Sequence, residues 1–258
     1  MSEYPDDHTI HTSIDIKELT SLPGGTKSIG HAIVQSFLNE GAIVHYCSRT
    51  EADIAIHKSD RAHGAVVDVS DPSQVTSWIS SAASQSGSID VVVANVSALV
   101  MSNEPAEWRK AFDTDMMGTH ALVTAALPHL EKSKGNVVTI SSVSGRMIDF
   151  SAGPGPYGAM KAALIHYTSQ VAHKYAPQGV RANTVSPGNI YVEDGVWGNI
   201  ERDMPEFFKK QMGDNPLGRM GKAEEVADVV VFLASERAAF VTGSNVVVDG
   251  ALATGVQF

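Results

Sequence analysis

Short runs of β-branched residues alternate with longer segments of helical periodicity along most of the chain. Six runs, most of them almost continuously apolar, predict strands buried on both faces of a parallel sheet: 42–47, 64–69, 90–95, 136–141, 180–186 and 245–250. Helical patterns separate them at about 28–40, 73–86, 105–133, 156–176 and 223–235. The same rhythm predicts a first strand at 17–22, although Glu18, Thr20 and Ser21 are polar.

The order of strand, helix and strand predicts right-handed crossovers and a doubly wound α/β sheet. No linker or repeat interrupts it, so we expect one domain over residues 13–258, preceded by a flexible tail over 1–12. Ligands of such sheets bind at the carboxyl ends of the strands, near the point where the strand order reverses.

Composition narrows the class of protein. The 258 residues are 43% apolar and 19% charged, which excludes a disordered chain, a fibrous repeat and a disulfide-stapled peptide. The net charge of −10 argues against binding to nucleic acid or anionic lipid. Cys47 is the single cysteine, so an internal disulfide and a cysteine zinc site are excluded, and we expect no metal and a reducing, cytoplasmic location. The acidic start lacks a signal-peptide pattern, and the apolar stretch 89–101 is too short to span a bilayer.

A glycine-rich turn, ProGlyGlyThrLysSerIleGly (23–30), follows the first strand and opens a helix. Small residues at such a turn let backbone N–H groups approach a phosphate at the positive end of the helix. The candidate cofactor-binding residues of this turn combine small side chains, hydroxyls and a cation: Gly24, Thr26, Lys27, Ser28 and Ile29. The alternative is an ordinary tight turn with a helix N-cap.

The end of the second strand, CysSerArgThr (47–50), carries no acid before Glu51. In a dinucleotide fold this point lies beside the adenosine ribose, where a carboxylate selects NAD and a cation accommodates the 2′-phosphate of NADP. Ser48, Arg49 and Thr50 therefore favour NADP(H), and Lys27 adds a second cation. The alternative for Arg49 is a solvated loop residue.

Tyr157 and Lys161 lie four residues apart in a helical segment, so they share one face. A nearby ammonium lowers the pKa of a phenol, which then serves as a general acid for a carbonyl oxygen or a base for an alcohol. Ser142 follows the strand 136–141 at the ligand-binding edge, with Ser141 as the neighbouring alternative. The alternative is that Tyr157 and Lys161 belong to an ordinary amphipathic helix and that Ser142 only forms a turn.

Taken together, these motifs resemble the short-chain dehydrogenase/reductase family, in its branch of chains of about 250 residues. The resemblance runs in order from Pro23 to Gly250. Beyond the glycine turn, Ser142, Tyr157 and Lys161, its further matches are AlaAsnValSer (94–97), Asp115, Pro187 with Gly188, ProLeuGlyArg (216–219) and ValAspGly (248–250).

This resemblance implies a Rossmann-type sheet of about seven strands, a nicotinamide cofactor and hydride transfer. Tyr157 would donate the proton, Ser142 would bind the substrate oxygen, and Lys161 would hold the nicotinamide ribose. The remaining cofactor contacts would come from strand ends and the loops after them: Asp68, Val69, Asn95, Val96, Pro187, Gly188, Ile190 and Val192. Many members are tetramers, so we expect a homo-oligomer, a tetramer or dimer, paired through the helices 105–133 and 156–176.

Several positions depart from the family pattern. Pro23 replaces a threonine, Ser28 a glycine and Val192 a threonine. Asp115 replaces the asparagine of the catalytic tetrad. An ionised aspartate only accepts hydrogen bonds, and its charge would stabilise the Lys161 ammonium and partly offset its effect on Tyr157. We therefore expect reduction to be favoured over alcohol oxidation; the alternative is a purely structural Asp115.

The substrate is expected to be a bulky, apolar carbonyl or imine compound. The segment 191–214 falls where the family carries a mobile substrate lid, and it is rich in apolar residues. Our candidate substrate contacts are Met147, Phe150 and Trp197. The leading hypothesis is an NADPH-dependent reductase. The alternatives are a secondary-metabolism enzyme that couples imine reduction to cyclisation, and a pseudoenzyme subunit with weak cofactor binding.

Overall fold

Seven parallel strands form the centre of the molecule. The computed structural model describes residues 18–23, 28–54, 56–148 and 154–255. The strands lie in the order β3-β2-β1-β4-β5-β6-β7. They are β1 (Glu18–Pro23), β2 (Ile43–Ser48), β3 (Ala62–Val66), β4 (Val91–Ala94), β5 (Asn136–Ile140), β6 (Arg181–Pro187) and β7 (Asn245–Val248). The order reverses between β1 and β4, as in a Rossmann-type sheet, so the predicted fold class is confirmed.

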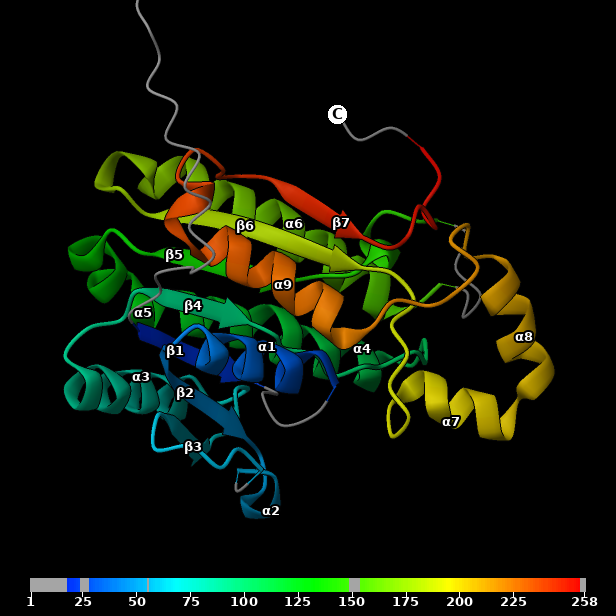
Figure 1. Ribbon diagram of the computed structural model, residues 1–258, viewed down its shortest axis with the longest axis horizontal. Helices are drawn as coiled ribbons and strands as arrows, with labels where there is room; N and C mark the ends of the chain where they lie inside the picture. The colour runs from blue at the N-terminus through cyan, green and yellow to red at the C-terminus, as the bar shows by residue number, and fades with distance from the viewer. Residues whose placement is uncertain (1–17, 24–27, 55, 149–153, 256–258) are drawn as a thin grey trace, which may run out of the picture.

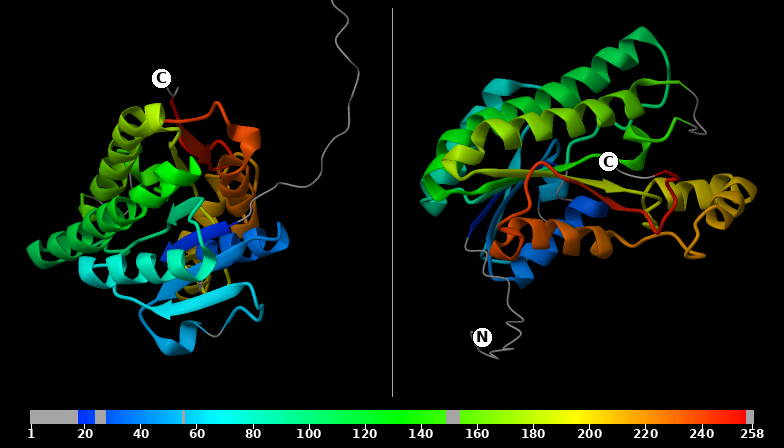
Figure 2. Two further views of the ribbon diagram at one scale, coloured as in Figure 1. Left: turned by 90° about the vertical axis from the view of Figure 1, so that its left-hand side faces the viewer. Right: turned by 90° about the horizontal axis from the view of Figure 1, so that it is seen from above.

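Helices cover both faces of the sheet (Figures 1 and 2). One face carries α1 (Ser28–Asn39) and α9 (Ala223–Ala234), and the other carries α3 (Pro72–Ser86), α5 (Gly118–Ser133) and α6 (Pro156–Tyr175). The shorter helices are α2 (Glu51–Ile54), α4 (Pro105–Ala111), α7 (Val196–Asp203) and α8 (Pro205–Gly213). A π-helical turn, η1 (Phe112–Met117), joins α4 to α5, and three 3₁₀ turns are η2 (Val143–Gly145), η3 (Ala176–Gln178) and η4 (Glu236–Ala238).

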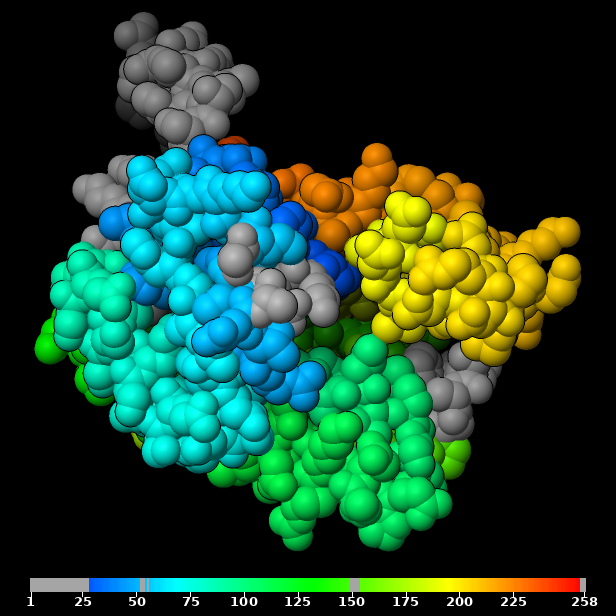
Figure 3. Space-filling model, turned by 90° about the horizontal axis from the view of Figure 1, so that it is seen from below, coloured from blue at the N-terminus to red at the C-terminus, as the bar shows by residue number. Residues whose placement is uncertain are grey.

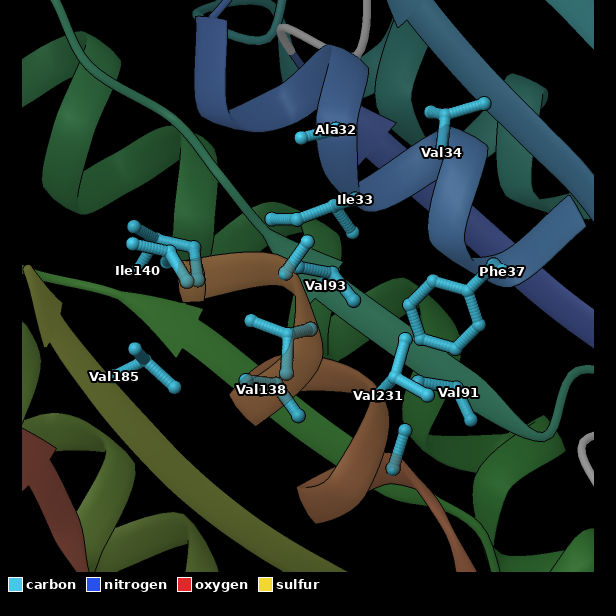
Figure 4. Close-up of a cluster of buried hydrophobic side chains, with 14 of the residues drawn as sticks. Ala32, Ile33, Val34, Phe37, Val91, Val93, Val138, Ile140, Val185 and Val231 are labelled. Carbon is cyan, nitrogen blue, oxygen red and sulfur yellow. The ribbon is translucent and has the colours of Figure 1, made fainter. Parts of the chain in front are cut away.

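Two apolar cores hold these layers together, one on each face of the sheet. In the first, Phe37 on α1 and Val231 on α9 pack over the β-branched side chains of β4, β5 and β6 (Figure 4). Phe37 is fully buried. The second core contains Trp78 of α3 and Leu122 of α5. Because both faces are covered, β4 consists of buried apolar residues along its whole length.

Local sequence explains where α3 begins and ends. Asp71 precedes α3, and its carboxylate accepts hydrogen bonds from the backbone N–H groups of Ser73 and Gln74. Pro72 occupies the first helical position, where its missing N–H is not needed. Gly87 ends the helix at φ 88°, in the left-handed region that glycine adopts without steric cost.

The structure corrects three of the predicted elements. The predicted helix 105–133 is interrupted by η1, because an extra residue widens the helix there. The strand expected at 64–69 forms at Ala62–Val66, and its side chains are exposed or half-buried because it is an edge strand. β7 is half-buried throughout for the same reason.

Some predictions concern residues that the structure does not describe. The tail 1–12, Gly24, Thr26, Lys27 and Phe150 lie outside the described residues. The polar segment predicted as the first strand does form β1, which pairs with β2 and β4. Within the described part of the chain, every helix is too short or too polar to cross a membrane.

Candidate active site

A close contact between η2 and α6 brings the predicted catalytic residues together. η2 follows β5 at the carboxyl edge of the sheet, and α6 begins at Pro156. A Cβ on Gly145 would lie 2.8 Å from the backbone nitrogen of Ala162, and one on Gly158 would lie 2.7 Å from the Ser144 carbonyl oxygen. The absence of both side chains lets the turn rest directly on the helix.

Ser142 and Ser141 have different roles in the structure. The Ser141 hydroxyl donates to the backbone carbonyl of Lys161 at 2.8 Å, so it fastens β5 to α6. Ser142 is buried at the start of η2 and forms a side-chain hydrogen bond with Tyr157. Its Oγ also accepts from the backbone N–H of Ser144 at 3.1 Å. Of the two alternatives, Ser142 is the serine that lies beside the phenol.

Lys161 is almost completely buried, with 3% of its side chain exposed. Its ammonium donates to the Val96 carbonyl at 2.8 Å and to the Ile140 carbonyl at 3.4 Å. It lies 5.8 Å from the centroid of the Tyr157 ring. Burial lowers the pKa of Lys161, because a charge loses hydration, and the negative charge of Asp115 opposes that shift.

Asp115 lies in η1 and supplies the counter-charge for this lysine. Its Oδ2 is 3.9 Å from Lys161 Nζ, and its side chain is 1% exposed. Burial raises the pKa of Asp115, while the Lys161 ammonium and a hydrogen bond from the Ala98 N–H lower it. The residue that departs from the family asparagine is therefore in direct electrostatic contact with the predicted catalytic lysine.

The pKa of Tyr157 is raised in the protein. Burial of the phenol is the main cause, the hydrogen bond with Ser142 lowers the pKa, and the charge of Asp115 raises it. The net direction is opposite to the lowering expected from Lys161 alone. The upward influence of Asp115 agrees with the sequence-based expectation. This arrangement holds the phenol protonated at neutral pH, in the form that can donate a proton.

The start of α1 provides the described part of the expected phosphate site. Ser28, which stands where the family pattern has glycine, is exposed and adopts φ 54°. That left-handed conformation suits glycine and costs a serine about 1–2 kcal/mol. Ile29 is half-buried and packs on the first core. The backbone therefore keeps the shape that a glycine would take.

The residues expected around the adenosine lie at the ends of β2 and β3. Ser48 is half-buried, while Arg49 and Thr50 are exposed. Val69 is buried, whereas Asp68 is exposed. The Asp68 carboxylate accepts from the backbone N–H and the hydroxyl of Ser70 at 2.9 and 2.7 Å, so this side chain stabilises its own turn.

The residues expected around the nicotinamide half follow β4 and β6. Asn95 is half-buried, and the neighbouring Val96 is buried with its carbonyl on the lysine. Pro187 ends β6, and a Cβ on Gly188 would lie 2.6 Å from Asp249 Cβ. Ile190 is buried and Val192 half-buried, and both pack against the first core. Asn95 and Gly188 thus directly follow strands of the sheet, and the cofactor contacts of these residues stay predictions.

The segment after β6 forms two helices beyond the carboxyl ends of the strands (Figure 1). Trp197 on α7 is half-buried and stacks on Phe207 of α8, with ring centroids 6.4 Å apart. Trp197 therefore packs α7 against α8, and its role in substrate binding stays a prediction. Met147, in the loop after η2, is half-buried. Seen from below, a hollow separates the yellow helices α7 and α8 from the green segment that holds α4 and from the blue start of α1 (Figure 3).

The chain matches the family described as enoyl-(acyl carrier protein) reductase over residues 24–252. It belongs to the short-chain dehydrogenase/reductase family. Two relatives in this family align with almost the whole chain. Isoepoxydon dehydrogenase of Aspergillus clavatus is 38% identical over 247 residues, 92% of this chain and 95% of that protein. L-fucose dehydrogenase of Mus musculus is 34% identical over 244 residues, 91% of this chain and 88% of that protein.

Solved structures have the same fold. ElxO with NADP bound superposes with a TM-score of 0.83 at 28% identity, covering 92% of this chain and 98% of that one. The ligand-free aldohexose dehydrogenase of Thermoplasma acidophilum gives a TM-score of 0.81 at 29% identity, covering 94% and 97%. The chain is thus an oxidoreductase with NADP-bound structural neighbours.

The sequence did not indicate the contact between the loop that follows β4 and Asp115. Ser97 and Ala98 both hydrogen-bond to the Asp115 carboxylate, and Leu99 adopts φ 49°. No single residue from Ser97 to Leu99 suggests this contact. Its signal lies in the pairing with Asp115, seventeen residues from Ala98 along the chain, which only the fold reveals.

We expect Gly145→Ala to disrupt the site by separating η2 from α6. The added methyl group would meet backbone atoms that cannot rotate away, so we predict a loss of about 1–3 kcal/mol in the free energy of unfolding. Gly213→Ala is the control, because a Cβ there meets nothing within 4 Å. Urea denaturation of both variants checks this, and equal stability of the two would contradict the close contact.

Proposed function

We propose that the protein is an NADPH-dependent reductase that transfers hydride to the C=O or C=N carbon of a bulky, apolar small molecule. The observation that carries this proposal is the cluster of Ser142, Tyr157 and Lys161, with Asp115 as counter-charge. A phenol with a raised pKa suits proton donation to an oxygen that gains negative charge. The relatives described as dehydrogenases and reductases support the reaction class.

The described residues suit NADP(H). Arg49 is exposed just after β2, and residues 47–50 contain no carboxylate. A 2′-phosphate there would meet the Arg49 cation and the hydroxyls of Ser48 and Thr50. The start of α1, Asn95 and the segment from Pro187 to Val192 would hold the rest of the molecule. The NADP-bound and NADPH-bound structures of ElxO support this choice. When bound, the cofactor supplies the hydride.

The side chains of this protein would orient the substrate and move the proton. Ser142 would donate a hydrogen bond to the substrate oxygen, and Tyr157 would deliver its phenolic proton to the same atom as negative charge develops. Lys161, held as an ammonium by Asp115, would stabilise the phenolate left behind. Ser142, Lys161 and Asp115 are buried and Tyr157 is half-buried, and the low local dielectric strengthens each of these interactions.

Exposed apolar side chains in the segments after β4 and β6 support an apolar substrate. They follow β4 and β6 and are 36–51% exposed: Leu99, Met101, Tyr191, Val196 and Met204. Apolar groups gathered at one edge of a sheet commonly mark a ligand site. Met147 and Trp197 would extend the same surface.

We also propose a cytoplasmic homo-oligomer that takes a small molecule as its partner. The acidic net charge of −10 disfavours nucleic acid and membrane surfaces. α5 and α6 cover the same face of the sheet, and His120 and Tyr167 lie 5.9 Å apart between them. The outer surfaces of these two helices are our candidates for pairing with a second copy. Size-exclusion chromatography with light scattering measures the assembly.

A screen of carbonyl and imine compounds with NADPH tests the reaction class. The reductase proposal predicts NADPH consumption with apolar ketones or imines and formation of the reduced product, detected by mass spectrometry. Tight NADPH binding without any turnover across the panel would contradict the reductase assignment. Failure to bind NADPH or NADH by fluorescence would instead favour a pseudoenzyme.

Tyr157→Phe is expected to abolish reduction while leaving NADPH binding nearly intact. The phenol acts only as the oxyanion develops, so the loss belongs in kcat and should reach about 10²–10⁴-fold. A tyrosine-to-phenylalanine variant of ElxO, solved with NADPH bound, is consistent with retained binding. Tyr175→Phe, at the far end of α6, is the control. Unchanged turnover in Tyr157→Phe would show that another group protonates the product.

Arg49→Ala is expected to raise the KM for NADPH by one or two orders of magnitude. A charge-assisted phosphate contact contributes about 1.5–3 kcal/mol, and NADH lacks that phosphate. The KM for NADH should therefore barely change. Arg61→Ala removes another exposed arginine, ahead of β3, and should affect neither cofactor. Equal losses for both cofactors would refute the phosphate assignment.

A further inference from the structure

The carboxylate of Asp115 touches two different parts of the site. Its Oδ1 accepts a hydrogen bond from the backbone N–H of Ala98 at 2.5 Å. Its Oδ2 lies 3.9 Å from Lys161 Nζ and makes no hydrogen bond to any described residue. One oxygen therefore serves the loop after β4, and the other serves the ammonium.

The loop after β4 is held in an unusual conformation. Leu99 adopts φ 49°, which a side chain with a Cβ rarely takes without help from its surroundings. The backbone N–H of Leu99 donates to the Ser97 hydroxyl at 3.0 Å, and Ser97 in turn hydrogen-bonds to Asp115. The carboxylate thus anchors two consecutive residues just before the left-handed one.

This loop borders the catalytic helix. A Cβ on Gly155, the residue before α6, would lie 3.0 Å from the Met101 carbonyl oxygen. Leu99 and Met101 are 46% and 37% exposed, and the Val96 carbonyl accepts from Lys161 Nζ. The loop therefore carries apolar side chains beside the end of α6 that holds Tyr157, while its own backbone contacts the lysine.

We propose that Asp115 is a positioning residue with two separable roles. Through Oδ1 it fixes Leu99 and Met101 as a wall of the substrate site, and through Oδ2 it holds Lys161 as an ammonium and Tyr157 as a neutral phenol. The second role biases the site toward reduction, so this inference rests on the proposed function. The first role identifies residues 97–101 as a determinant of substrate binding.

The groups that face the phenol and the ammonium come from four elements. β5 and η2 contribute the Ile140 carbonyl and the Ser142 hydroxyl, and the loop after β4 contributes the Val96 carbonyl. η1 contributes Asp115, the charged group that shifts both Tyr157 and Lys161 among the described residues. Removal of its charge should lower the pKa of Tyr157, so any activity that depends on this phenol should shift to lower pH.

Asp115→Asn separates the two roles, because the amide oxygen can still accept from Ala98 but carries no charge. We expect the Tyr157 titration, followed by NMR of ¹³C-labelled tyrosine and assigned with Tyr157→Phe, to move to lower pH by about one unit. The rise of alcohol oxidation with pH should move in the same direction. Hydrogen exchange over 96–101 and the substrate KM should remain near wild type.

Asp115→Ala removes both roles. Hydrogen exchange over 96–101 should become at least about tenfold faster, since the Ala98 hydrogen bond is lost, and the substrate KM should rise. If this variant does not fold, hydrogen exchange is measured in Ser97→Ala instead, which removes the hydrogen bond between Ser97 and Asp115. Asp113→Asn, in the same π-turn, is the matched control and should leave exchange and titration unchanged.

A Tyr157 titration within about 0.3 pH units of wild type in Asp115→Asn would overturn the electrostatic role. Exchange and KM equal to wild type in Asp115→Ala, or in Ser97→Ala if it replaces that variant, would overturn the loop role. The NMR and exchange measurements need no substrate. They therefore remain decisive even if the reductase assignment fails, which would appear as a lack of turnover in the wild-type protein.

Discussion

A buried ammonium needs a counter-charge, and the whole site is arranged around this requirement. Lys161 is almost completely buried, and the hydrogen bonds to two backbone carbonyls cannot neutralise its charge. Asp115 does so from η1. Removal of one partner from a buried ion pair typically costs about 3–5 kcal/mol, because the other charge is left unpaired. The same carboxylate raises the pKa of Tyr157, so the ion pair and the phenol are linked through Asp115.

Backbone architecture delivers these groups to one place. Parallel strands bring the loops after β4, β5 and β6 to a single edge of the sheet, and two glycines let η2 rest on α6. The π-turn between α4 and α5 adds a residue to the helix and carries Asp115, whose Oδ2 lies 3.9 Å from Lys161 Nζ. A hollow lies beside the helices α7 and α8 (Figure 3).

Much of this arrangement is predictable from sequence because it follows periodicity and order. The β-branched runs predict the central strands, and the spacing of Tyr157 and Lys161 predicts a shared helix face. The interruption of the helix at η1 is not predictable, because helical periodicity continues through a π-turn. The contact of Asp115 with Ala98 also depends on tertiary packing. The raised pKa of Tyr157 requires knowledge of its burial, which a motif does not contain.

The protonation state of Lys161 tests most directly whether Asp115 keeps this buried lysine charged. ¹⁵N NMR of labelled lysine, with the resonance assigned by its loss in Lys161→Arg, reports whether the buried group is an ammonium or an amine. We expect Lys161 to be an ammonium at neutral pH in the wild-type protein, and to lose its proton at lower pH in Asp115→Asn. A neutral amine at pH 7 in the wild type, or the same titration in both proteins, would contradict it.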